Sequence, residues 1–131
     1  MNSKYAPLFQ PFTLNNGVTV KNRLAVAPMT HFGSLADGLI SDQERTFLGN
    51  RAGDMGLFIS AATLVQEGGK AFRGQPEATG ENCLDSLKET AQIIQKQGAK
   101  AILQIHHGGS QAMVELNRRD KISASASEKD G

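Results

Sequence analysis

Three sites along the sequence carry side chains that could do chemistry, and each follows or interrupts an apolar run: Thr30, Gln104, and the pair His106 and His107. Thr30 offers a hydroxyl, although a lone threonine is more typical of a turn. Gln104 has an amide oxygen and an amide nitrogen, so it can answer a donor and an acceptor side by side. Buried amides need partners, so a structural bond and a bond to a ligand are both open for Gln104.

Neither the histidine pair nor a nearby glycine pair predicts a metal or phosphate site. Adjacent residues on a strand point to opposite faces, so His106 and His107 cannot readily chelate one ion, and no cysteine or carboxylate follows at ligand spacing. Gly68-Gly69-Lys70 lacks the spacing of a phosphate-binding loop and does not lead directly into a helix. We therefore expect no metal, and a flexible active-site loop over residues 66–81.

Three apolar runs would position these polar side chains. They span residues 24–27, 55–65 and 99–107. Nearly continuous apolar character predicts parallel strands that are buried on both faces. Pro28 ends the first run, because it cannot donate a ladder hydrogen bond, and turns the chain outward. Ligands bind at the carboxyl ends of such strands, so residues 27–32 are the first place to look for chemistry.

Helix signals lie between the apolar runs. Ser41-Asp42-Gln43-Glu44 forms a capping box and Gly53 offers a left-handed stop, which predicts a helix over about residues 42–52. Asn82 caps a second helix with apolar side chains at helical spacing, and Gly98 ends it. Alternating strands and helices indicate an α/β fold with a parallel sheet.

A β-hairpin is predicted over about residues 12–20, before the first buried strand. Two alternating arms flank Asn16-Gly17, the strongest short-range hairpin signal. A two-stranded hairpin is marginal alone, so we expect it to pack on the end of a larger sheet.

Composition excludes several classes of protein. The 131 residues are 39% hydrophobic and 21% charged, as in an ordinary globular domain. Fourteen basic and thirteen acidic residues give a net charge of +1 with no basic block, so we expect no nucleic-acid or membrane partner and a small-molecule substrate instead. Cys83 is the only cysteine, which fits a reducing compartment. No segment is predicted to be a signal peptide or membrane span, so we expect a cytoplasmic protein whose oligomeric state is open.

Taken together and in this order, several stretches of the chain resemble the old yellow enzyme family, the FMN-containing oxidoreductases that use NADH or NADPH. They are Pro7-Leu8-Phe9, Asn22-Arg23, Ala27-Pro28-Met29-Thr30, Arg51-Ala52-Gly53, Gly56-Leu57-Phe58-Ile59, Ala62-Thr63, Gly98-Ala99-Lys100 and Gln104-Ile105-His106-His107-Gly108-Gly109. The resemblance implies a TIM (β/α)₈ barrel with a hairpin at its base. Residues 1–131 would then be the N-terminal portion of a single barrel domain, with the remainder of the barrel outside this chain.

The resemblance also implies an FMN site at the strand ends. Ala27 and Ala62 are small enough for the backbone to approach the flavin ring, whose polar edge their amide and carbonyl groups can serve. Thr30 would bond the carbonyl oxygen next to the reactive flavin nitrogen and tune its reduction potential, and Gln104 would meet the pyrimidine edge. The expected cofactor-binding residues are Ala27, Pro28, Met29, Thr30, Ala62 and Gln104, with Phe32 near the substrate.

Some features leave other interpretations open. Without the resemblance, Pro28 and Met29 would be a strand stop and a core filler. Ser110 stands where the family pattern has an arginine.

The expected reaction is hydride transfer from NADH or NADPH to FMN, and then to an electron-poor alkene or related acceptor. No residue of this segment qualifies as a catalytic proton donor, and the segment alone is expected to be inactive. Two alternatives are another barrel enzyme, such as a phosphate-binding lyase or isomerase, and a non-catalytic fragment that pairs through its open sheet edges.

Overall fold

A three-stranded parallel sheet forms the centre of the chain. The computed structural model describes residues 2–117 and 121–125. Its central strands are β3 (Ala25–Val26), β4 (Leu57–Ile59) and β6 (Lys100–Ile102), in the order β3-β4-β6. All neighbours in this sheet are parallel. The parallel arrangement predicted from the apolar runs is therefore confirmed.

Two further strands continue β4 and β6. They are β5 (Thr63–Leu64) and β7 (Ile105–His106), which also pair in parallel. Each predicted strand over 55–65 and 99–107 is thus two short strands. Between the short strands the ladder has a break, where the Ser60 hydroxyl, instead of a backbone carbonyl, accepts from the Gln104 N–H at 3.0 Å. The Thr63 N–H then donates to the Gln104 carbonyl at 2.9 Å, so the two segments stay side by side through the break.

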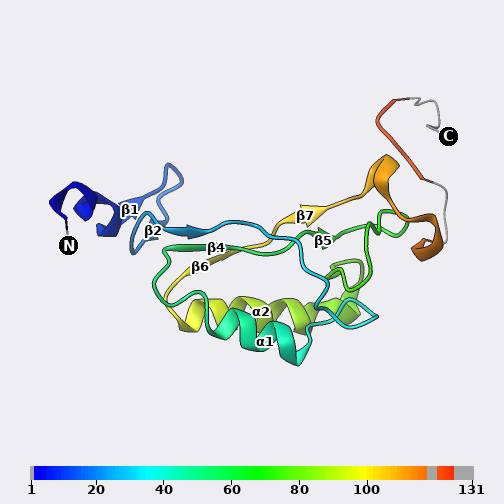
Figure 1. The fold of residues 1–131 in the computed structure, drawn as a ribbon, viewed down its shortest axis with the longest axis horizontal. Coiled ribbons are helices and arrows are strands. Elements are labelled where there is room, and N and C mark those ends of the chain that lie inside the picture. Colours follow the sequence, from blue (N-terminus) through cyan, green and yellow to red (C-terminus); the bar gives the residue numbers. More distant parts are fainter. Residues whose placement is uncertain (1, 118–120, 126–131) are drawn as a thin grey trace.

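Both long helices lie on one side of the strands (Figure 1). They are α1 (Asp42–Gly49) and α2 (Leu84–Lys96), and between them and the sheet lies the core of Ile40, Leu48, Ala52, Phe58, Ile94 and Ala99. On the opposite face Ala25 is exposed and Ile102 is 41% exposed. The expectation of strands buried on both faces is wrong for these residues, because helices cover only one face in the described part of the chain.

The start of α1 matches the prediction and its end does not. The Ser41 hydroxyl accepts from the Glu44 N–H at 3.2 Å, and the Glu44 carboxylate accepts from the Ser41 N–H at 3.0 Å, which confirms the capping box. The helix ends at Gly49, where the Asn50 N–H turns back to the Phe47 carbonyl. Gly53 has no positive φ, so the predicted stop there is wrong.

The second helix shows the reverse pattern, with a correct end and a different start. A 3-10 turn, η2 (Glu81–Cys83), leads into α2, so Cys83 rather than Asn82 stands at the N-cap and gives no side-chain cap bond. Gly98 has φ +85°, which confirms the predicted stop. Ile94 is 1% exposed in the core, whereas Leu84, expected on the same apolar stripe, is 50% exposed.

The N-terminal hairpin lies at the amino ends of the sheet strands (Figure 1). Its strands β1 (Phe12–Thr13) and β2 (Thr19–Val20) pair antiparallel. The remaining elements are the 3-10 turns η1 (Ser3–Phe9), η3 (Gly109–Gln111) and η4 (Val114–Leu116). Within residues 2–117 and 121–125, every helix is too short or too polar to cross a membrane.

Candidate functional site

The predicted site residues follow the carboxyl ends of neighbouring parallel strands. Thr30 follows β3, Ala62 lies between β4 and β5, and Gln104 lies between β6 and β7. Because β3, β4 and β6 are parallel neighbours, these segments leave the sheet at the same edge, the one formed by the carboxyl ends of the strands. The bond from the Thr63 N–H to the Gln104 carbonyl brings the Ala62 and Gln104 segments together.

Residues at this edge combine unpaired polar groups with exposed apolar surface. Neither the Thr30 hydroxyl nor the Gln104 side-chain amide has a hydrogen-bond partner among the described residues. Met29 is 63% exposed, Phe32 72% and Ile105 68%. Ala27 is exposed, and Ala62 is 5% exposed. Small residues, free hydrogen-bonding groups and apolar surface are what a flat ring with one polar border needs.

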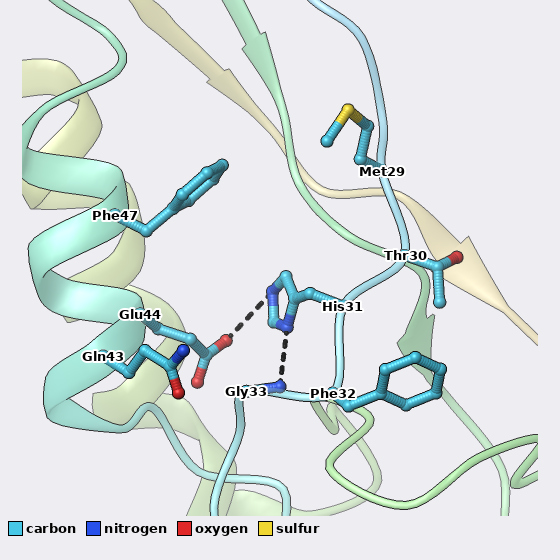
Figure 2. A pocket seen from close by; sticks show the side chains of 8 residues that line it. All are labelled: Met29, Thr30, His31, Phe32, Gly33, Gln43, Glu44 and Phe47. Carbon is cyan, nitrogen blue, oxygen red and sulfur yellow. Dashed lines mark hydrogen bonds and ion pairs between the residues drawn. The ribbon is translucent and has the colours of Figure 1, made fainter.

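Side chains of the segment after β3 alternate in direction. Figure 2 shows Met29 and His31 on the side of α1, and Thr30 and Phe32 on the other side. A pocket of about 350 Å³ lies between this segment and α1, lined by Met29, Thr30, His31, Phe32, Gly33, Gln43, Glu44 and Phe47. Neither Ala62 nor Gln104 lines it, so this pocket does not unite the predicted site.

Glu44 holds the segment after β3 against α1 (Figure 2). Its carboxylate, on a residue that is 8% exposed, lies 3.3 Å from His31 Nε2 and accepts from the Ser34 hydroxyl at 3.0 Å. The Gly33 N–H donates to His31 Nδ1 at 3.2 Å, so Nε2 carries the proton that faces Glu44. From the sequence only the capping role of Glu44 was predicted, because a contact across the pocket leaves no local pattern.

Gln75 is a buried hub that the sequence did not reveal. It is 0% exposed, and its amide oxygen accepts from the Ala71 N–H at 2.9 Å. Its amide nitrogen donates to the Ala62 carbonyl at 3.2 Å and faces His106 Nδ1 at 3.1 Å. Since an amide nitrogen can only donate, His106 Nδ1 is the acceptor. The Ala62 carbonyl, expected to serve a cofactor, is thus shared with Gln75 and keeps one lone pair.

The loop over residues 66–81 packs directly on the segment after β3. The Ser34 N–H donates to the Gly74 carbonyl at 3.2 Å. A Cβ at Gly74 would lie 2.4 Å from the Phe32 carbonyl oxygen, so only glycine permits this approach. The rings of Phe72 and Phe32 meet edge to face, with centroids 5.4 Å apart. The loop therefore contributes an aromatic wall beside Phe32, and Phe72 was also missed from the sequence.

The two adjacent histidines have separate surroundings. His106 faces Gln75, whereas His107 Nδ1 accepts from the Gly109 N–H at 2.9 Å. A Cβ at Gly69 would lie 2.3 Å from the His107 ring, so this glycine permits close packing against His107. In the part of the chain that the structure describes, no three His, Cys, Asp or Glu side chains cluster as metal ligands.

The family of the chain follows from comparison with known proteins. Residues 7–131 match the model of the NADH:flavin oxidoreductase / NADH oxidase family. The chain belongs to this family. The resemblance to the old yellow enzymes is thereby confirmed, and FMN with NADH or NADPH as hydride donor is the family's cofactor set.

Named relatives agree with this membership. The chain is 52% identical over 116 residues to "Probable NADH-dependent flavin oxidoreductase YqiG" of Bacillus subtilis (strain 168), covering 88% of this chain and 31% of the relative. It is 39% identical over 102 residues to "NADH:fumarate oxidoreductase" of Klebsiella pneumoniae (strain 342), covering 78% and 11%. The chain thus spans about a third or less of the length of these relatives.

Solved structures share the fold of this chain. An old yellow enzyme homologue from Zymomonas mobilis superimposes with a TM-score of 0.84 at 24% identity, covering 95% of this chain and 34% of that one. A 2-naphthoyl-CoA reductase, solved with 2-naphthoyl-CoA, gives a TM-score of 0.79 at 31% identity, covering 85% and 17%. The mixed α/β architecture with parallel strands is consistent with part of a (β/α)₈ barrel.

Proposed function

We propose that this chain supplies the FMN-binding strand ends of a TIM-barrel oxidoreductase. Residues 1–131 would be the N-terminal portion of its single barrel domain. The observation that carries the proposal is the position of Thr30 and Gln104 at one edge of a parallel sheet in a chain of the flavin oxidoreductase family. Among the described residues, neither side chain has a hydrogen-bond partner. Exposed apolar side chains lie at the same edge, as the faces of a flat ring require.

Each residue has a distinct proposed task. The Thr30 hydroxyl donates to the flavin carbonyl oxygen beside the reactive nitrogen, which favours negative charge there and tunes the reduction potential. The Gln104 amide pairs with the pyrimidine edge, because its oxygen and nitrogen match an adjacent N–H and carbonyl. Backbone groups of Ala27 and Ala62 approach the ring, with Gln75 holding the Ala62 carbonyl in place. The backbone of Pro28 and Met29 is proposed to lie along the ring, because the Met29 side chain points to the α1 side (Figure 2).

The acceptor is proposed to be an electron-poor alkene or a related molecule. When bound, FMN would supply the hydride-transfer chemistry between NADH or NADPH and the acceptor. Phe32 flanks the acceptor, and Phe72 stands behind Phe32. Together these rings exclude water from one side of the site. We assign the proton donor and the remaining acceptor contacts to parts of the protein outside this chain.

The proposal is tested on the protein as its gene encodes it. The purified protein is expected to bind FMN, to lose its yellow colour anaerobically with NADH or NADPH, and to regain it when an electron-poor alkene is added. Thr30→Val and Gln104→Leu should weaken FMN binding, whereas the exposed Gln66→Leu should not. A protein that takes up no added FMN would contradict the proposal and favour a different barrel enzyme.

A further inference from the structure

We propose that Glu44 is a positioning residue for the flavin-facing side chains Thr30 and Phe32, and that it acts through His31. The inference rests on the proposed function, because that function assigns Thr30 and Phe32 to the cofactor side of the sheet edge. Nothing in the sequence pattern beyond the helix cap pointed to Glu44.

Glu44 connects α1 to the chain that leaves β3. Three donors converge on its carboxylate: His31 Nε2 at 3.3 Å, the Ser34 hydroxyl at 3.0 Å and the Ser41 N–H at 3.0 Å. The Ser41 bond belongs to the helix cap, but the other two lie outside the helix and hold the chain after β3. A carboxylate is the only side chain that can accept all three without donating.

The His31 ring is held from both of its nitrogens. Nδ1 accepts from the Gly33 N–H at 3.2 Å, and Nε2 faces Glu44. The ring therefore has one orientation in which both bonds are made. Because Thr30 and Phe32 point away from α1 while His31 points toward it (Figure 2), fixing His31 also fixes the direction of both neighbours.

This arrangement predicts that a change on the α1 side reaches the flavin side. Glu44→Gln keeps the size of the side chain but replaces one acceptor oxygen by an NH₂ group, so at least one of the three donors then faces another donor. His31→Phe removes one of the two links to the segment and leaves Glu44 with Ser34 and Ser41. A small displacement of the Thr30 hydroxyl would then alter its bond to the flavin.

The experiment measures the midpoint potential and the visible spectrum of bound FMN, together with FMN affinity, in the full protein. Glu44→Gln and His31→Phe should each shift the potential in the same direction as Thr30→Val and weaken FMN binding by about tenfold. Gln43→Ala is the matched control, because Gln43 is the neighbour of Glu44 on α1 and lines the same pocket. It should leave potential and affinity unchanged.

A double-substitution cycle separates positioning from a general loss of stability. In a Thr30→Val background, Glu44→Gln should cause little or no further shift of the potential, because the hydroxyl that it positions is gone. A full additional shift of the potential in that background would overturn the inference. So would folded Glu44→Gln and His31→Phe variants whose potentials are unchanged. Neither result would contradict the proposed function. If Glu44→Gln does not fold, His31→Phe decides. A wild-type protein without FMN would overturn the proposed function itself.

Discussion

Replacing Gln75 with leucine is expected to destabilise the protein by about 2–4 kcal/mol. The side chain is 0% exposed, and its loss would leave the Ala71 N–H, the Ala62 carbonyl and His106 Nδ1 without their partner. Each buried group left unpaired costs about 1–3 kcal/mol. Ala71 and His106 are half-buried and regain some contact with water, so the expected total stays well below the full sum.

Urea unfolding of Gln75→Leu at neutral pH gives this number directly, from the shift of the midpoint at constant slope. Gln66→Leu is the matched control, because Gln66 lies exposed in the same loop and should stay within about 0.5 kcal/mol of the wild type. Affinity for FMN should also fall in Gln75→Leu, since Gln75 holds the Ala62 carbonyl. A stability loss no larger than that of the control would refute the role assigned to Gln75.

The core, a surface ion pair and the Thr30 hydroxyl can each be tested by one substitution. Ile94→Ala, at a side chain that is 1% exposed between α2 and the sheet, should cost about 2–5 kcal/mol in urea unfolding, whereas a cost near zero would mean that the core is elsewhere. The Arg45 guanidinium hydrogen-bonds Glu89 and lowers the pKa of its carboxyl, so the pair's contribution is present above the unfolded-state pKa and is lost as the pH falls through the folded-state pKa. Glu89→Gln should therefore be slightly less stable than the wild type at pH 7 and equal to it in acid; a difference that persists in acid would contradict this. Thr30→Val should leave unfolding of the FMN-free protein unchanged but shift the potential of bound FMN. An unchanged potential would remove Thr30 from the site.

Local signals in the sequence predicted local structure well. The capping box at Ser41 and Glu44 and the left-handed stop at Gly98 depend on residues within one helical turn, and both are confirmed. The helix stop predicted at Gly53 and the N-cap predicted at Asn82 are wrong, and the reason is again local. A nearer turn at Asn50 ends α1, and the 3-10 turn η2, which includes Asn82 and Cys83, leads into α2. Gly53 and Asn82 therefore lie outside the helix ends, although both have suitable chemistry.

Burial and strand continuity depend on the rest of the fold and could not be derived from apolar runs alone. Ala25 lies in such a run and is nonetheless exposed, because both helices pack on the other face of the sheet. The run over 55–65 divides at Ser60, whose hydroxyl replaces a ladder carbonyl for Gln104. That bond joins residues far apart in the sequence, so periodicity carries no trace of it.

For the candidate site, too, the sequence indicated local placement but not contacts between distant segments. Pro28 marks the end of a strand, so the sequence placed Thr30 at a strand end, and the Gln104 segment does lie beside the Ala62 segment. Their roles toward FMN stay predictions. Gln75 and Glu44 were missed as site residues because their partners come from other segments of the chain, which only the fold brings together.

We propose that the edge formed by the carboxyl ends of β3, β4 and β6 holds one flavin ring. A crystal structure of the FMN-loaded protein would show this placement. We expect the Thr30 hydroxyl and the Gln104 amide within about 3 Å of the same isoalloxazine ring, on its polar border. A flavin bound away from this edge, or one that contacts neither side chain, would show that the placement is wrong.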